Sequence, residues 1–170
     1  GYTSAAHGWS TGVLPALSNY ILGVIPTAPG FRHWILKPIP AGGVDWARGE
    51  VPTPKGPFKV KWALQDISGV FQMQVEVPMN TEGEVAVPVR LEFAEVMVNN
   101  VIVWKGGREQ HLRAQYYEGY VRFRLSGGKY RITVCNAARI WNRLQSCGLS
   151  VLYSSGIIAM FRVVGANGYG

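Results

Sequence analysis

The stretch Phe58-Lys59-Val60-Lys61-Trp62 alternates apolar and basic side chains, and it gives the clearest indication of the fold class. Successive side chains of a β-strand point to opposite faces, so this alternation is typical of a strand with one buried and one solvated face. Val121-Arg122-Phe123-Arg124-Leu125 repeats the pattern, and the Gly127-Gly128 pair behind it predicts a tight hairpin into another strand. Both stretches therefore predict an antiparallel sheet that buries one face.

The same period of two recurs along the chain between residues 33 and 134, interrupted by Gly, Asn and Pro turns such as Glu82-Gly83 and Asn99-Asn100. Many short strands without intervening helices are typical of an antiparallel β-sandwich. The sequence thus predicts a mainly β protein. The predicted strands are His33–Ile39, Phe58–Leu64, Val70–Val77, Glu84–Val89, Glu95–Val103, Tyr120–Leu125 and Lys129–Val134.

One α-helix is predicted ahead of the sandwich, from Ser10 to Gly23, followed by a Pro/Gly-rich crossing segment. Ser10 or Thr11 can cap its first turn, and Gly23 suits the left-handed position after its last turn. A single helix cannot bury an apolar stripe alone, so this one needs a partner surface. The stripe consists of Val13, Leu14, Leu17, Ile21 and Val24.

Composition and charge exclude several classes of protein. With 48% hydrophobic and 16% charged residues the 170-residue chain has the composition of a folded domain. The net charge is +7, but the basic residues are scattered, so we expect ordinary surface charge and no nucleic-acid partner. No apolar run is long enough for a membrane span, and the three dispersed histidines and two cysteines lack zinc spacing. We therefore predict no membrane partner, no metal and no cofactor; whether Cys135 pairs with Cys147 stays open.

Ordered motifs in residues 2–134 carry a resemblance to one family. They are Ser4–Gly12 (Ser-Ala-Ala-His-Gly-Trp-Ser-Thr-Gly), Leu17–Val24, Pro26–Phe31, Ile35–Pro38, Trp46–Gly49, Val51–Pro57, Lys59–Trp62 and Gly83–Pro88. The first three resemble the closing motif of the (α/α)6-barrel catalytic domain in family-78 glycoside hydrolases, the α-L-rhamnosidases. The next four resemble the crossing into that family's C-terminal β-sandwich, and Gly83–Pro88 resembles a strand of that sandwich.

The resemblance implies a division into three parts: residues 1–31 are the terminal helix and linker of a truncated barrel, and 32–134 are the C-terminal sandwich. Residues 135–170 are an atypical tail without any acidic residue, and we expect it to be poorly ordered. The implied activity is hydrolysis of terminal α-L-rhamnosides, in glycosides or polysaccharides, by an inverting mechanism. That mechanism uses two carboxyl groups about 6.5–9.5 Å apart. In the family both precede the motif that contains His7, so we expect this chain to lack the catalytic acid and base, to pack against the missing barrel and to be inactive alone.

His7 and Trp9 are the candidate substrate-binding residues, and no catalytic residue is predicted. The resemblance places His7 in the rhamnose subsite, where an imidazole can hydrogen-bond a hydroxyl. Trp9 can stack on a pyranose face, although packing of the barrel's last helix explains it equally well. The alternative function is a non-catalytic carbohydrate-binding sandwich, with Tyr116, Tyr117 and Tyr120 as its best candidates. For the remaining tryptophans we favour core or rim positions.

Overall fold

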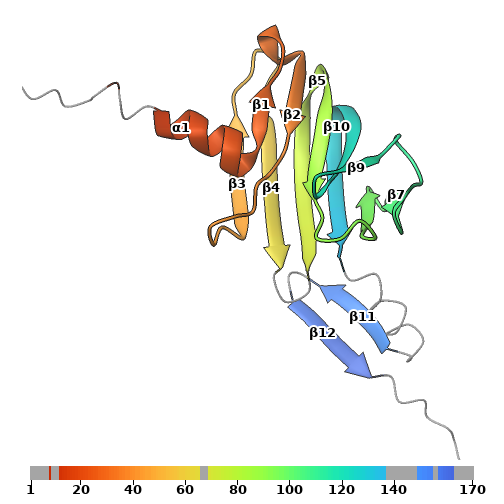
Figure 1. The fold of residues 1–170 in the computed structure, drawn as a ribbon. Helices are drawn as coiled ribbons and strands as arrows, with labels where there is room; N and C mark the ends of the chain where they lie inside the picture. Colours follow the sequence, from red (N-terminus) through yellow and green to blue (C-terminus); the bar gives the residue numbers. More distant parts are fainter. Residues whose placement is uncertain (1–7, 9–11, 66–68, 137–148, 155–156, 163–170) are drawn as a thin grey trace, which may run out of the picture. The chain divides into compact units, whose positions relative to one another are not determined.

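The computed structural model describes residues 8, 12–65, 69–136, 149–154 and 157–162, and the chain divides into two compact units, Gly1–Asn136 and Ala137–Gly170. The first unit is mainly β, as predicted, and its strands β1 to β10 form one hydrogen-bonded sheet (Figure 1). Its elements are α1 (Val13–Ala16), the π-helical turn η2 (Leu17–Leu22), β1 (Val24–Pro26), the 3-10 turn η3 (Pro29–Phe31), β2 (His33–Leu36), β3 (Trp46–Val51), β4 (Phe58–Gln65), β5 (Val70–Pro88), β6 (Glu95–Val98), β7 (Val101–Lys105), β8 (Arg108–Glu109), β9 (Gln115–Tyr117) and β10 (Tyr120–Cys135).

The two long strands β5 and β10 are the central pair of the sheet. Their length shows that two turns predicted from the sequence were wrong. Turns were predicted at Glu82-Gly83 and Gly127-Gly128, but both strands continue through these glycines. The antiparallel register instead shifts between Ser126 and Gly128, so that Gly127 stands opposite an irregular segment of β5. Glycine is required there because a Cβ on Gly127 would lie 2.6 Å from the Cα of Met79. These glycines permit a bend and a close approach rather than a chain reversal.

The bend lets the two strands serve both layers of the sandwich. Residues 82–88 of β5 and 120–126 of β10 continue into β1, β2 and β9, whereas 70–77 and 128–135 continue into β3, β4 and β6–β8. Trp34 on β2 meets Phe58 on β4 edge-to-face, with ring centroids 4.9 Å apart, and both are fully buried. One continuous apolar core therefore lies between the layers.

Strands β1 and β3 were not predicted as strands. β1 pairs with β2 because Gly23 adopts the left-handed conformation (φ 87°) and turns the chain directly from η2 into the sheet. This confirms the predicted role of Gly23 at the end of the helical segment. β3 pairs antiparallel with β4, and exposure alternates along it, so it is a half-buried edge strand.

Asn136 closes the first unit with two hydrogen bonds. Its Oδ1 accepts from the backbone N–H of Arg90 at 2.8 Å, and its Nδ2 donates to the carbonyl oxygen of Gly69 at 2.6 Å. In the second unit β11 (Leu149–Ser154) pairs antiparallel with β12 (Ile157–Arg162). Within the described ranges, no helix is long and apolar enough to cross a membrane.

Candidate functional site

The predicted sugar-binding residues His7 and Trp9 lie outside the residues that the structure describes. Their roles stay predictions. The same segment is described continuously from Gly12 onward, and it shows how the chain that carries them joins the sandwich.

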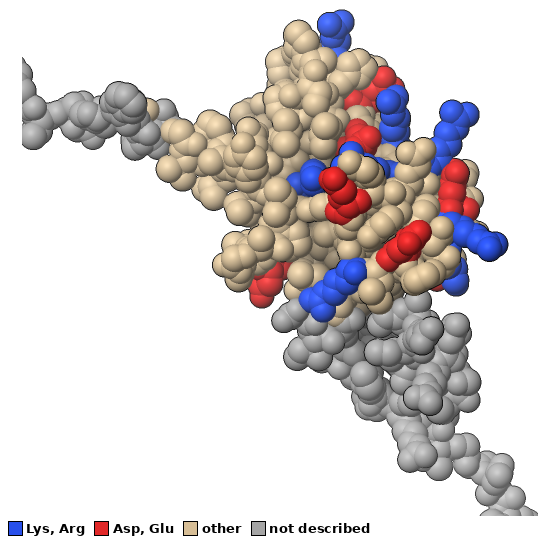
Figure 2. Space-filling model, viewed as in Figure 1, with Lys and Arg blue, Asp and Glu red and all other residues tan. Residues whose placement is uncertain are grey.

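The outward side of α1 and η2 is an exposed apolar surface, which we call the helix face and define as Val13, Leu14, Leu17 and Tyr20. These side chains are 59%, 71%, 49% and 61% exposed, respectively. No charged residue occurs in α1 or η2, and Figure 2 shows this projection free of blue and red side chains. Much of the stripe predicted from the sequence is thus left without a partner surface within the described residues. Exposed apolar groups clustered in this way are typical of an interaction surface.

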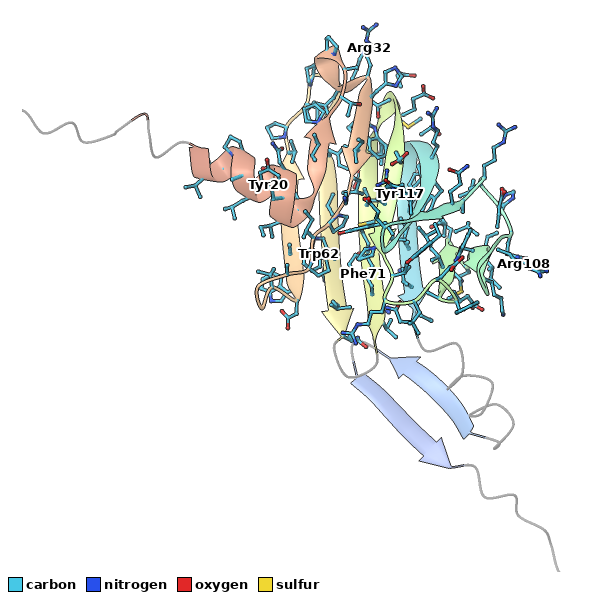
Figure 3. The ribbon with its side chains drawn as sticks, viewed as in Figure 1. Tyr20, Arg32, Trp62, Phe71, Arg108 and Tyr117 are labelled. Carbon is cyan, nitrogen blue, oxygen red and sulfur yellow. The ribbon has the colours of Figure 1, made fainter. Side chains whose placement is uncertain are left out.

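The opposite side of the same segment is attached to the sandwich. Leu22 is 6% exposed and packs over Gly49 of β3, where an added Cβ would lie 3.0 Å from a Leu22 methyl carbon. The indole nitrogen of Trp62 on β4 donates to the carbonyl oxygen of Ile21 at 3.1 Å. Trp62 in turn stacks on Phe71 of β5, and both are labelled in Figure 3. The helix face is therefore presented outward from a segment that is held by the core.

Buried tryptophans confirm the predicted packing roles, and one exposed tryptophan departs from them. Trp34, Trp62 and Trp104 are at most 6% exposed. Each donates its indole N–H to a protein oxygen. Trp46, in contrast, is 65% exposed on edge strand β3. Trp141 lies outside the described residues.

The tyrosines that were predicted as a carbohydrate platform are partly covered by cations. Tyr116 and Tyr117 are 37% and 54% exposed, but the Arg122 guanidinium lies over the Tyr117 ring at 4.9 Å. The Lys37 ammonium lies over the Tyr120 ring at 4.6 Å. Glu118 raises the pKa of Tyr117 through a hydrogen bond and its negative charge, whereas burial raises that of Tyr120. These rings are therefore not a row of free stacking surfaces.

Four of the described carboxylates have a basic side chain within ion-pair distance. Glu76, Glu82, Glu84 and Glu95 pair with Lys59 and Lys129, His33, Arg122 and Lys105, respectively. In the part of the chain that the structure describes, no three His, Cys, Asp or Glu side chains gather as metal ligands would.

Comparisons with known proteins agree on one family. Residues 23–101 match the family model described as the bacterial alpha-L-rhamnosidase C-terminal domain. An alpha-L-rhamnosidase of Alteromonas sp. (strain LOR) is 34% identical over 91 residues, which cover 51% of this chain and 10% of that protein. An alpha-L-rhamnosidase of Streptomyces avermitilis is 29% identical over 117 residues, which cover 67% of this chain and 10% of that protein. The solved alpha-L-rhamnosidase from Dictyoglumus thermophilum superposes with a TM-score of 0.64 and 28% identity, covering 72% of this chain and 13% of that one. The chain thus spans about a tenth of the curated relatives it matches.

Proposed function

We propose that the chain is the C-terminal part of a bacterial α-L-rhamnosidase, which the match of residues 23–101 to that family's C-terminal domain model supports. Its sandwich supports a catalytic domain that docks on the helix face. The observation that carries this proposal is the uncharged, exposed side of α1 and η2 on a segment anchored by Leu22 and Trp62.

The docking partner we propose is the catalytic barrel itself. A surface of apolar side chains that are each at least 49% exposed is costly to leave in water, and a helical barrel can cover it with the apolar sides of its own helices. The place of the helix face in the chain, directly before the family domain, supports this partner.

We propose that the parent enzyme hydrolyses terminal α-L-rhamnosides with inversion, and that this chain alone is catalytically silent. Inversion requires an acid to protonate the leaving oxygen and a base to activate water. The contacts of Glu76, Glu84 and Glu95 support the second part, since each of these carboxylates is ion-paired with a lysine or arginine. In the assembled enzyme, His7 contributes a hydrogen bond to a sugar hydroxyl, and Trp9 either stacks on a pyranose face or packs with the barrel's last helix.

Two measurements test this proposal. The purified 170-residue chain, incubated with p-nitrophenyl α-L-rhamnoside, should release no nitrophenol above the buffer rate; turnover by the chain alone would contradict it. The coding sequence directly upstream of Gly1 should continue in frame into a helical barrel that carries the two carboxylates. An in-frame stop codon immediately before Gly1 would refute the proposal that the chain is part of a larger enzyme.

A non-catalytic carbohydrate-binding sandwich is the second candidate, favoured by the exposure of Tyr116 and Tyr117. Titration calorimetry with rhamnose-rich oligosaccharides tests it, and binding should then be lost in Tyr117→Ala. An absence of heat would remove this candidate without affecting the first.

A further inference from the structure

The outer face of strands β3, β4, β5 and β10 is hollowed into an open groove with a volume of about 1010 Å³. These four strands lie side by side in the sheet (Figure 1). Because their register is continuous, side chains on the outer face form rows that run across the strands. The composition of these rows differs sharply from one to the next.

One row is electrically compensated. Glu50, Lys59, Glu76 and Lys129 are successive cross-strand neighbours, so that the charges alternate in sign. The Glu76 carboxylate lies 4.0 Å from the Lys59 ammonium and 3.4 Å from that of Lys129. Opposite charges on neighbouring strands attract each other, so this row stabilises the solvated face of the sheet.

The adjacent row, which we call the basic row, is uncompensated: Arg48, Lys61, Gln74 and Arg131 are successive cross-strand neighbours. It contains three cations and no acid. Arg48 stands directly opposite Lys61, a like-charge pairing that lowers stability. Within the described ranges neither Arg48, Lys61 nor Arg131 has a carboxylate in ion-pair contact.

An exposed aromatic ring flanks the basic row. Trp46 precedes Arg48 by two residues on β3, so both side chains lie on the outer face. The cross-strand neighbour of Trp46 is Ala63, whose methyl group is too small to cover an indole. The ring is 65% exposed.

We propose that Trp46 and the basic row form a binding site for an acidic oligosaccharide. The indole stacks on the apolar face of one pyranose, the cations of Arg48, Lys61 and Arg131 bind acidic groups, and the Gln74 amide hydrogen-bonds a hydroxyl. Neighbouring strands are about 4.8 Å apart, close to the length of one sugar unit, so a chain that crosses the strands meets one side chain per unit. This inference goes beyond the proposed function and does not rest on it.

The same observations favour an acidic sugar over nucleic acid. Single strands bind where several aromatic rings stack successive bases beside a long basic track. On this face Trp46 is a single described ring, and beyond the basic row the next row is neutralised by its own ion pairs. A short ligand with a few negative charges matches this pattern.

The test is titration calorimetry of the 170-residue chain with galacturonate oligosaccharides, with sulfated carrageenan oligosaccharides as a second acidic probe. Neutral dextran oligosaccharides and oligo-dT serve as comparison ligands. We expect binding of an acidic oligosaccharide that weakens as salt is added. Arg48→Gln/Lys61→Gln should raise Kd about tenfold, because two charge-assisted contacts are lost, and Trp46→Ala should raise it about fivefold. Preference for the carboxylated or the sulfated probe identifies the acidic group.

The matched control is Arg32→Gln/Arg108→Gln, which removes two exposed cations remote from the basic row; both are labelled in Figure 3. This variant should bind within about twofold of the parent. Arg48→Gln/Lys61→Gln should also unfold at no lower a urea concentration than the parent, since a repulsive pair is relieved. The proposal is overturned if neither acidic oligosaccharide binds, if dextran binds equally well, if oligo-dT binds more tightly, or if the control loses as much affinity.

Discussion

The close approach of β5 to β2 depends on the absence of a side chain at Gly83, and this makes Gly83→Ala the sharpest test of the fold. A Cβ built there lies 2.5 Å from Cε3 of Trp34 and falls well inside contact with the Trp34 carbonyl oxygen. Neither group can yield easily, because Trp34 is 1% exposed and its indole donates to Thr81 Oγ1 at 3.1 Å. Overpacking of a core costs about 1–3 kcal/mol, and contact with a backbone carbonyl places this case at about 3 kcal/mol.

Urea unfolding followed by tryptophan fluorescence measures the effect. With a slope of about 2 kcal/mol per molar urea, the midpoint of Gly83→Ala should fall by about 1.5 M. The matched control is Gly12→Ala, where an added Cβ meets nothing within 4 Å and φ is −65°. Its stability should change by no more than about 0.5 kcal/mol. A loss below about 1 kcal/mol in Gly83→Ala would refute the reasoning, since β5 would then be free to move away from β2.

Three further outcomes follow from the contacts of the first unit. Leu22→Ala should lower the free energy of unfolding by about 2–3 kcal/mol in the same urea assay, because it removes the buried side chain that anchors η2 on β3. An unchanged midpoint would contradict that anchoring. Asn136→Ala should cost about 2–4 kcal/mol by leaving two backbone groups without their partner, whereas a loss below about 1 kcal/mol would show that water replaces the amide. In a Cys147→Ser background Cys135 should react slowly with Ellman's reagent and accelerate only at alkaline pH, because burial and then the Glu95 charge raise its pKa. Rapid reaction at neutral pH would contradict this last prediction.

For the candidate sites, the sequence indicated which residues share a strand face but not which residues stand opposite them. The alternation in Trp46-Ala47-Arg48-Gly49-Glu50-Val51 could have identified β3 and placed Trp46, Arg48 and Glu50 together on one face. It could not show that Arg48 stands opposite Lys61, because the register of two strands is a long-range property. The tyrosines near Gly119 were found from sequence. The sequence did not show that Arg122 on β10 lies over the Tyr117 ring, or that the distant Lys37 lies over the Tyr120 ring.

Local periodicity by itself determined which side of β4 is buried. Phe58, Val60 and Trp62 are at most 2% exposed, as their alternation with lysine predicts, because neighbouring side chains of a strand must point to opposite faces. The same local logic placed Gly23 at the end of the helical segment. Only the tertiary structure decided that Gly127 stands at a register shift between the long strands, that Gly83 lies against Trp34, and that the helix face stays outside the core. All three depend on which distant parts of the chain pack against a residue, and the neighbouring sequence does not specify that.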